Sequence, residues 1–480
     1  MSVALRHRVL RRLPVALAGS LAAALAGAEA AQAHAGLAQR ENLPIPEWLF
    51  AAAAGVVLAV SFVALAVLWP EPKLERPRFR PLPSPLDRLG GRTARIVCGA
   101  IGVFLLALTL ATALGGPDDA DDNFASPFVF IIFWVGLVFA SILLGNVFAA
   151  FNPWLALGRA MERLAGRTEP PRAYPERLGY WPAVGGLVAF AWMELAFAYG
   201  TEPRRLAVAV VVYTVITLAA MARYGARTWA ERGETFGVYF TLVSRVAPFE
   251  ARDGRAGLRP PLSGLTRVQP QAGLVPLLAV MIGMTTYDGF EQGRIWRENV
   301  LPDLTSFFES LGASFTAAET LAATTGLAAG ILAVAAFYAL GIAGARTVKG
   351  SPGASRLRSG FVHSLVPIAV VYVIAHYLTY LVFDGQRISW TASDPFGQGW
   401  DLFGTADAGI DYSVLSQNAT WYLQVGAVVA GHVAALMLAH DRALSVYREG
   451  RLAVRSQYWM LLIMIGFTML ALWLLASANK

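Results

Sequence analysis

The chain has 480 residues, of which 56% are hydrophobic and only 15% are charged, and its mean hydropathy is +0.51. Several apolar runs are long enough to cross a hydrocarbon core of about 30 Å, which excludes an ordinary soluble protein and predicts an all-α, polytopic integral membrane helix bundle. The single cysteine, Cys98, excludes an intramolecular disulfide and a thiolate metal cage. The net charge of +7 comes from basic residues in short loops, so we expect no nucleic-acid binding.

The N-terminus has the pattern of a signal peptide. Four arginines between Arg6 and Arg12 precede an apolar stretch that is followed by the small-residue sequence Ala31-Gln32-Ala33. Cleavage there would make residues 1–33 the signal peptide and leave 34–480 as a single transmembrane domain that begins with His34. A retained N-terminal anchor is the alternative.

Hydrophobic segments predict about ten transmembrane helices. In chain order they are 48–69, 96–114, 127–151, 181–199, 206–221, 273–286, 317–343, 361–383, 420–438 and 458–476. Between the fifth and sixth spans, residues 235–249 are apolar enough for an interfacial or re-entrant helix. The longest outside segment, 384–419, is expected to form a lid or vestibule over the neighbouring spans.

The distribution of basic residues predicts the orientation. If the mature N-terminus lies outside, five loops are cytoplasmic, and these contain 28 Lys and Arg residues against 7 in all the outside segments. Such an excess on one side is the positive-inside bias. We therefore expect a multi-pass protein of the cytoplasmic membrane with its mature N-terminus outside.

Four of the six histidines lie in or at the ends of the eighth and ninth spans. Ionisable side chains at membrane depth are costly and mark candidate functional sites. His376 follows His363 by about 20 Å of helix, and His440 follows His432 by about 12 Å. His363 and His440 therefore fall at the cytoplasmic edge, whereas His376 and His432 differ in depth by about 7 to 8 Å and could flank one cavity.

Carboxylates and other polar groups fall near the level of His376. Glu194 lies deep in the fourth span, and Asp288 and Asp384 mark the outer ends of the sixth and eighth. In one hypothesis His376 and His432 bind a divalent metal ion (zinc, manganese or copper), and Glu194 and Asp288 are catalytic, as ligand or general base. Further hydrogen-bonding groups nearby are Tyr377, Tyr380 and Gln424.

The same histidines permit other interpretations. Each of them also suits a structural hydrogen bond between helices or at the membrane edge. Two haems stacked between two helices would need suitably spaced histidines on both helices. His363 and His376 have a suitable separation, but His432 and His440 do not, so only a single bound haem remains as an alternative. Relay of a cation or proton in a transporter is a further alternative. His34 suggests copper chelation at the mature N-terminus, although the outside segments contain no second histidine.

Several stretches together resemble a known family. They are HAGLAQRENLPIPEWLF after the signal, GNVFAAFNPW, the Trp-Met-Glu of the fourth span, RDGRAGLRPPLSGL, TTYDGF, HSLVPIAVVYVIAHYLTYLVFDGQ and GHVAALMLAHDRAL. They are similar to bacterial membrane proteins labelled fenitrothion hydrolase, a membrane-bound organophosphorus hydrolase, over nearly the whole mature chain. The resemblance implies an enzyme of the bacterial inner membrane that hydrolyses a P–O bond of a small apolar phosphotriester and releases a phenol. It assigns no catalytic residues, so the candidate residues rest on depth alone.

Overall fold

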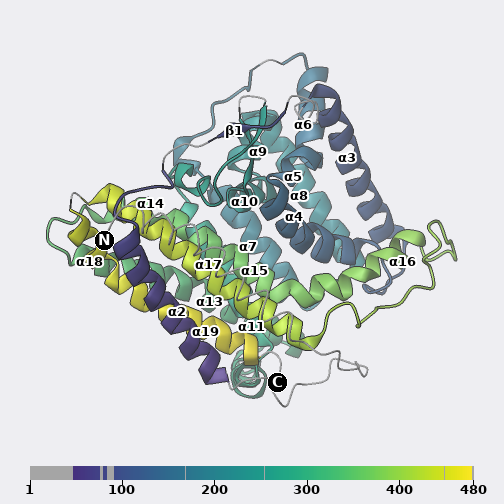
Figure 1. Ribbon diagram of the computed structural model, residues 1–480. Coiled ribbons are helices and arrows are strands. Elements are labelled where there is room, and N and C mark those ends of the chain that lie inside the picture. The colour runs from purple at the N-terminus through teal and green to yellow at the C-terminus, as the bar shows by residue number, and fades with distance from the viewer. Residues whose placement is uncertain are drawn as a thin grey trace.

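The computed structural model describes residues 47–75, 79–83, 91–167, 169–252, 255–447 and 449–477. The predicted signal peptide and His34 lie outside these ranges. Within them, the chain is the expected all-α polytopic membrane helix bundle, with one small sheet at its edge (Figure 1).

Eight segments of the described chain are long and apolar enough to cross a membrane. They are Leu49–Leu68, Thr93–Gly115, Pro127–Leu144, Pro203–Tyr224, Phe315–Arg346, Ala354–Val382, Gln417–Val446 and Gly450–Leu474. The predicted spans 181–199 and 273–286 are not among them. The first corresponds to α7 (Trp181–Leu195), which has only 15 residues, and the second to α11 (Leu274–Glu291), whose last turn is acidic.

The helices differ widely in length. The other long ones are α2 (Glu47–Leu68), α3 (Arg92–Gly115), α8 (Pro203–Tyr224), α13 (Phe315–Arg346), α15 (Leu365–Val382), α17 (Gln417–Val446) and α19 (Tyr458–Ser477). The shorter ones are α4 (Leu137–Leu144), α5 (Val147–Phe151), α6 (Pro153–Leu164), α9 (Ala226–Arg232), α10 (Thr235–Ser244), α12 (Leu301–Ser310), α14 (Ala354–Phe361), α16 (Arg387–Ser393) and α18 (Gly450–Ser456). Two π-helical segments, η2 (Pro127–Gly136) and η5 (Trp296–Val300), and four 3₁₀ turns, η3 (Glu176–Leu178), η4 (Leu265–Arg267), η6 (Val362–Ser364) and η7 (Asp384–Gln386), complete the chain order.

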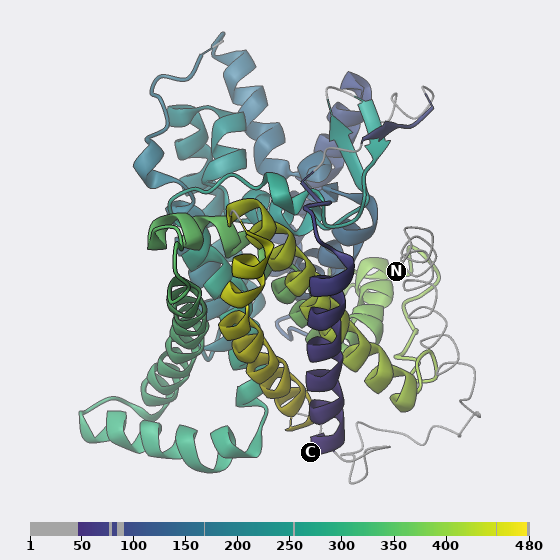
Figure 2. The same cartoon turned by 60° about the vertical axis from the view of Figure 1, so that its left-hand side comes forward.

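The helices form two groups that meet along α7, α11 and α15 (Figure 1). One group contains α2, α13, α17 and α19, and the other contains α3, α6, α8 and α9. Figure 2 shows α2 and α19 side by side in the first group. Because α11 packs against α13, α15 and α7, its polar residues face protein rather than lipid, and 13 of its 18 residues are buried.

The helix expected near 235–249 is α10, and protein encloses it. Nine of its ten residues are buried, and it packs against α4, α5, α7 and α9. Glu234 caps its N-terminus by accepting hydrogen bonds from the backbone amides of Phe236 and Gly237 at 3.0 and 2.7 Å. An interfacial helix keeps an apolar face against lipid. Protein therefore encloses this helix, and the expected interfacial or re-entrant position in a membrane stays a prediction.

The basic loop after α10 forms the strands β2 (Phe249–Arg252) and β3 (Arg255–Leu258). With β1 (Arg80–Pro81), from the segment between α2 and α3, they make a small antiparallel sheet of order β1-β3-β2. Arg259 ties this sheet to α10, since its buried guanidinium donates to the carbonyl of Ser244 at 2.9 Å. Burial lowers the pKa of Arg259 to about 10, and the carboxylate of Glu250, 3.5 Å away, opposes that shift.

Close packing at Gly102 of α3 provides a test of the fold. A Cβ atom there would lie 1.9 Å from the carbonyl oxygen of Phe151 in α5, so Gly102→Ala has to push the two helices apart. We expect this variant to lose about 1–3 kcal/mol of stability. Thermal unfolding of the detergent-purified protein measures the loss as a lower midpoint temperature.

Gly115→Ala on the same helix is the matched control, because nothing lies within 4 Å of its Cβ position. It should be neutral, or slightly stabilising through the higher helix propensity of alanine. Equal unfolding temperatures for the two variants would contradict the packing of α3 on α5.

Candidate functional site

The polar centre of the bundle is a contact between α11 and α15. The Nε2 atom of His376 lies 3.0 Å from Oδ2 of Asp288, and the neighbouring Tyr377 donates its hydroxyl proton to the same oxygen at 2.5 Å. Asp288 and Tyr377 are buried. The three side chains form one hydrogen-bonded unit, the His–Asp–Tyr centre.

The position of each residue in its helix explains how they meet. Asp288 lies three residues before the end of α11, and His376 lies six residues before the end of α15. These separations correspond to about 5 and 9 Å of helix. Since the two spans are predicted to run in the same direction, both residues lie at a similar level near the C-terminal ends of their helices.

The imidazole of His376 keeps one nitrogen available. Within the described residues Nδ1 has no hydrogen-bond partner, and the side chain is 19% exposed. Gly289 lies against this edge of the ring, where a Cβ atom would be 3.7 Å from Nδ1. A histidine that a carboxylate holds through one nitrogen, with the other nitrogen open, has the arrangement of a general base.

Two further carboxylates lie near the centre. Glu291 follows Asp288 by one turn of α11, and Glu194 comes from α7. Glu194 is close enough to both Asp288 and Glu291 for electrostatic repulsion. Its Oε2 atom is buried and has no hydrogen-bond partner within the described chain. The region therefore has an excess of negative groups, which a proton or a cation would offset.

His432 has different surroundings. Its Nδ1 atom lies 2.8 Å from the carbonyl oxygen of Val428, and its Nε2 atom is buried without a partner among the described residues. Its ring packs 6.1 Å from the ring of Tyr372, one turn before His376 on α15. His376 and His432, which the sequence predicts at different depths, therefore lie in separate surroundings.

The metal centre expected at His376 and His432 stays a prediction. Among the residues that the structure describes, no group of three or more His, Cys, Asp or Glu side chains is placed to hold a metal ion. Catalytic zinc sites use three protein ligands, whereas the His–Asp–Tyr centre offers a histidine and a carboxylate that are already bonded to each other.

The two histidines predicted at the cytoplasmic edge differ in their contacts. His440 lies 3.2 Å from the side-chain oxygen of Gln457 and 3.1 Å from the backbone carbonyl of Trp69, so it links α17 to the ends of α2 and α18. His363 lies buried in η6, and its Nε2 atom has no partner within the described chain.

The remaining candidates border the His–Asp–Tyr centre. Gln424 of α17 donates to the carbonyl oxygen of Ala375 at 2.8 Å, and therefore fixes the residue next to His376. The ring of Tyr380 lies 6.2 Å from that of Tyr377. Asp384 instead lies 3.4 Å from Arg387 in the outer segment.

Sequence reasoning missed three buried or partly buried acids. Glu291 is at the i+3 position from Asp288, a spacing that puts both on one helix face and was visible in the sequence. Glu234 caps α10, and Asp441 accepts a hydrogen bond from the indole of Trp69 at 2.9 Å. The partners of these last two come from distant segments, so local patterns do not indicate them.

No protein-family model, curated protein or solved structure matches this chain. The geometry of the centre therefore provides the main basis for a functional proposal.

The bond between Asp288 and His376 predicts one tautomer of the neutral imidazole, because the carboxylate accepts a proton only from Nε2. We expect Nε2 to carry the proton and Nδ1 to be bare. Nitrogen NMR of the ¹⁵N-histidine-labelled protein measures this, with His376→Gln to assign the signals. A proton on Nδ1 in the neutral ring would contradict the orientation of His376 described above.

Proposed function

We propose that this chain is a membrane-bound hydrolase of small apolar esters, of the organophosphate triester class, in which His376 is the general base. One observation carries the proposal: Asp288 holds Nε2 of His376 at 3.0 Å while Nδ1 stays open. The resemblance to bacterial membrane proteins labelled fenitrothion hydrolase supports the same substrate class. The apolar helices that surround the centre support a lipid-soluble substrate.

In the proposed reaction a water molecule at Nδ1 of His376 attacks phosphorus. The nitrogen takes one proton of the water while the oxygen forms the new P–O bond. The P–O bond to the aryl group breaks, and the phenolate that leaves receives the proton from the imidazolium. One water is consumed, and the products are a dialkyl phosphate and a phenol.

Asp288 and Tyr377 have positioning roles in this reaction. The carboxylate of Asp288 fixes the imidazole and stabilises its protonated form, as the acid of a catalytic triad does. The hydroxyl of Tyr377 holds that carboxylate in place from the same helix as His376.

The buried position of the centre supports an uncharged substrate. Glu194 and Glu291 lie close to Asp288 in surroundings that disfavour charge, so bringing the anionic phosphate of a monoester or diester there is costly. A phosphotriester has no such charge and partitions into a bilayer. We therefore expect triesters to be cleaved and diesters to be rejected.

His376→Gln and Asp288→Asn test the proposal directly. Loss of a general base costs about 10²–10⁴-fold in rate, so we expect turnover of a nitrophenyl phosphotriester to fall by at least about 10²-fold in both variants. Release of nitrophenol by the protein in lipid nanodiscs is the measurement. His432→Gln is the matched control, because it removes another buried histidine with an unpartnered nitrogen.

Two outcomes would overturn this mechanism. If turnover is unchanged in His376→Gln, His376 is not the general base. Turnover that a chelator abolishes and zinc restores would instead assign the attacking water to a metal ion.

Proton- or cation-coupled transport is a second candidate, and the unpartnered buried oxygen of Glu194 favours it. In that case Glu194→Gln abolishes flux across liposomes, and wild-type protein yields no hydrolysis product. Hydrolysis predicts the reverse: product forms without any ion gradient, and the same variant leaves most of the turnover.

A further inference from the structure

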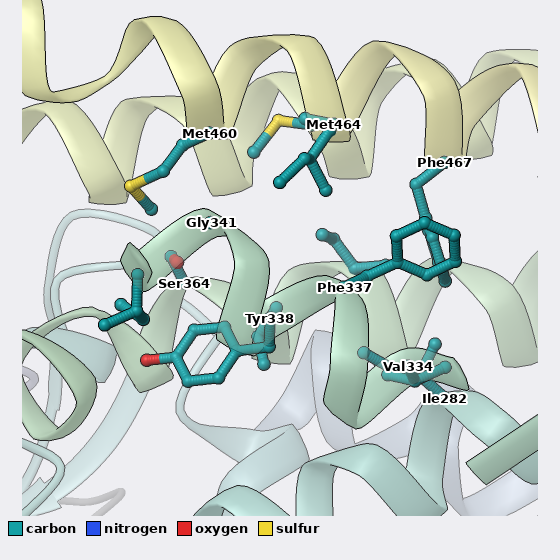
Figure 3. A pocket seen from close by; sticks show the side chains of 13 residues that line it. Ile282, Val334, Phe337, Tyr338, Gly341, Ser364, Met460, Met464 and Phe467 are labelled. Carbon is teal, nitrogen blue, oxygen red and sulfur yellow. The ribbon is translucent and has the colours of Figure 1, made fainter. Parts of the chain in front are cut away.

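An apolar groove lies between α11, α13, α15 and α19, away from the His–Asp–Tyr centre (Figure 3). It has a volume of about 70 Å³. Figure 3 shows Phe337 and Tyr338 of α13 facing Met460, Met464 and Phe467 of α19. Most of the walls belong to helices that are apolar enough to cross a membrane, and Phe337 on one wall is exposed, so lipid can reach the groove.

The groove is suited to an apolar occupant. Its volume is several times the about 10–15 Å³ that a single water needs, but a buried water also needs two to four polar partners. The walls contain two hydroxyls, and both are already bonded: Ser364 donates to the carbonyl of Phe361 at 2.7 Å, and Tyr338 donates to the carbonyl of Arg358 at 2.5 Å. A hydrocarbon chain fits these walls better than water does.

Exposed cations surround one end of the groove. Arg346 follows the groove residue Ile342 by one helical turn, and the hydrogen bond from Tyr338 holds α14 at the same end. Six cations are exposed there, and none forms an ion pair within the described chain: Arg346, Lys349, Arg356, Arg358, Arg451 and Arg455. The described segments 344–360 and 449–456 contain one acid, Glu449.

We propose that the groove and these cations form a binding site for an anionic phospholipid. One acyl chain lies in the groove, and the phosphate lies against the arginines at its end. Basic pockets between transmembrane helices bind anionic head groups in this way. The end of the bundle concerned is the one that positive-inside bias predicts to be cytoplasmic, so the lipid belongs to that leaflet.

Lipid binding to the detergent-purified full chain tests the proposal, with phosphatidylglycerol and phosphatidylcholine as probes. Native mass spectrometry gives the affinity for each lipid. We expect phosphatidylglycerol to bind at least about tenfold tighter than phosphatidylcholine, since each arginine near a lipid phosphate contributes about 1 kcal/mol, or roughly fivefold. Equal affinities would overturn the proposal.

Two pairs of variants locate the site. Gly341→Leu fills the groove and should weaken phosphatidylglycerol binding, whereas Gly466→Leu on α19, where nothing lies within 4 Å, should not. The double variant Arg356→Gln/Arg358→Gln should weaken binding by on the order of tenfold. Its control is Arg172→Gln/Arg177→Gln, exposed cations in another loop on the same side.

If both double arginine variants weaken phosphatidylglycerol binding equally, the lipid binds to the general positive charge of that face and not to the groove. That result would overturn the proposal. Oligomer dissociation on Gly341→Leu, with lipid binding unchanged, would assign the groove to a second copy of the chain instead. Unfolding temperatures in phosphatidylcholine show whether Gly341→Leu folds: its Cβ would be 3.7 Å from Met460, an ordinary contact distance.

Discussion

A polar group at membrane depth has to find its partners within the protein, because the hydrocarbon core offers none. This constraint explains the arrangement of α7, α11 and α15. These helices carry Glu194, Asp288 and His376, and they lie between the two groups of helices. The contact between Asp288 and His376 joins α11 to α15 at the junction.

The same constraint separates structural histidines from the catalytic candidate. His440 has a partner for each ring nitrogen, and His432 is fully enclosed, whereas His376 combines a carboxylate partner with an open nitrogen and partial exposure. Only the last combination leaves a lone pair that can accept a proton from a second molecule. The site is therefore compact, and it uses two adjacent residues of α15 and one of α11.

Much of the fold follows from the sequence, because hydropathy and charge act on each segment separately. Composition predicted the helix bundle, and helical rise predicted that His376 and His432 lie at different depths. Hydropathy predicts ordinary transmembrane helices at 181–199 and 273–286. In the structure they form the short helix α7 and the largely buried helix α11, which can carry acids because protein covers them.

The contacts between distant segments could not be predicted in the same way. Depth places Asp288 near the level of His376, but nothing in the local pattern indicates that α11 and α15 are neighbours. The burial of α10 also depends on neighbours from several other helices, and its own apolar sequence suits a lipid surface equally well. Pairing of helices that are not consecutive in the chain is therefore the information that the structure adds.

The most direct test of the central claim is a double-mutant cycle on Asp288 and His376, read out as kcat for phosphotriester cleavage. If the two residues act as one unit, Asp288→Asn should cost little or nothing once His376 has been replaced by Gln. We therefore expect the double variant to be about as active as His376→Gln alone. Losses that multiply, so that each substitution lowers kcat by the same factor in either background, would contradict a catalytic His–Asp pair.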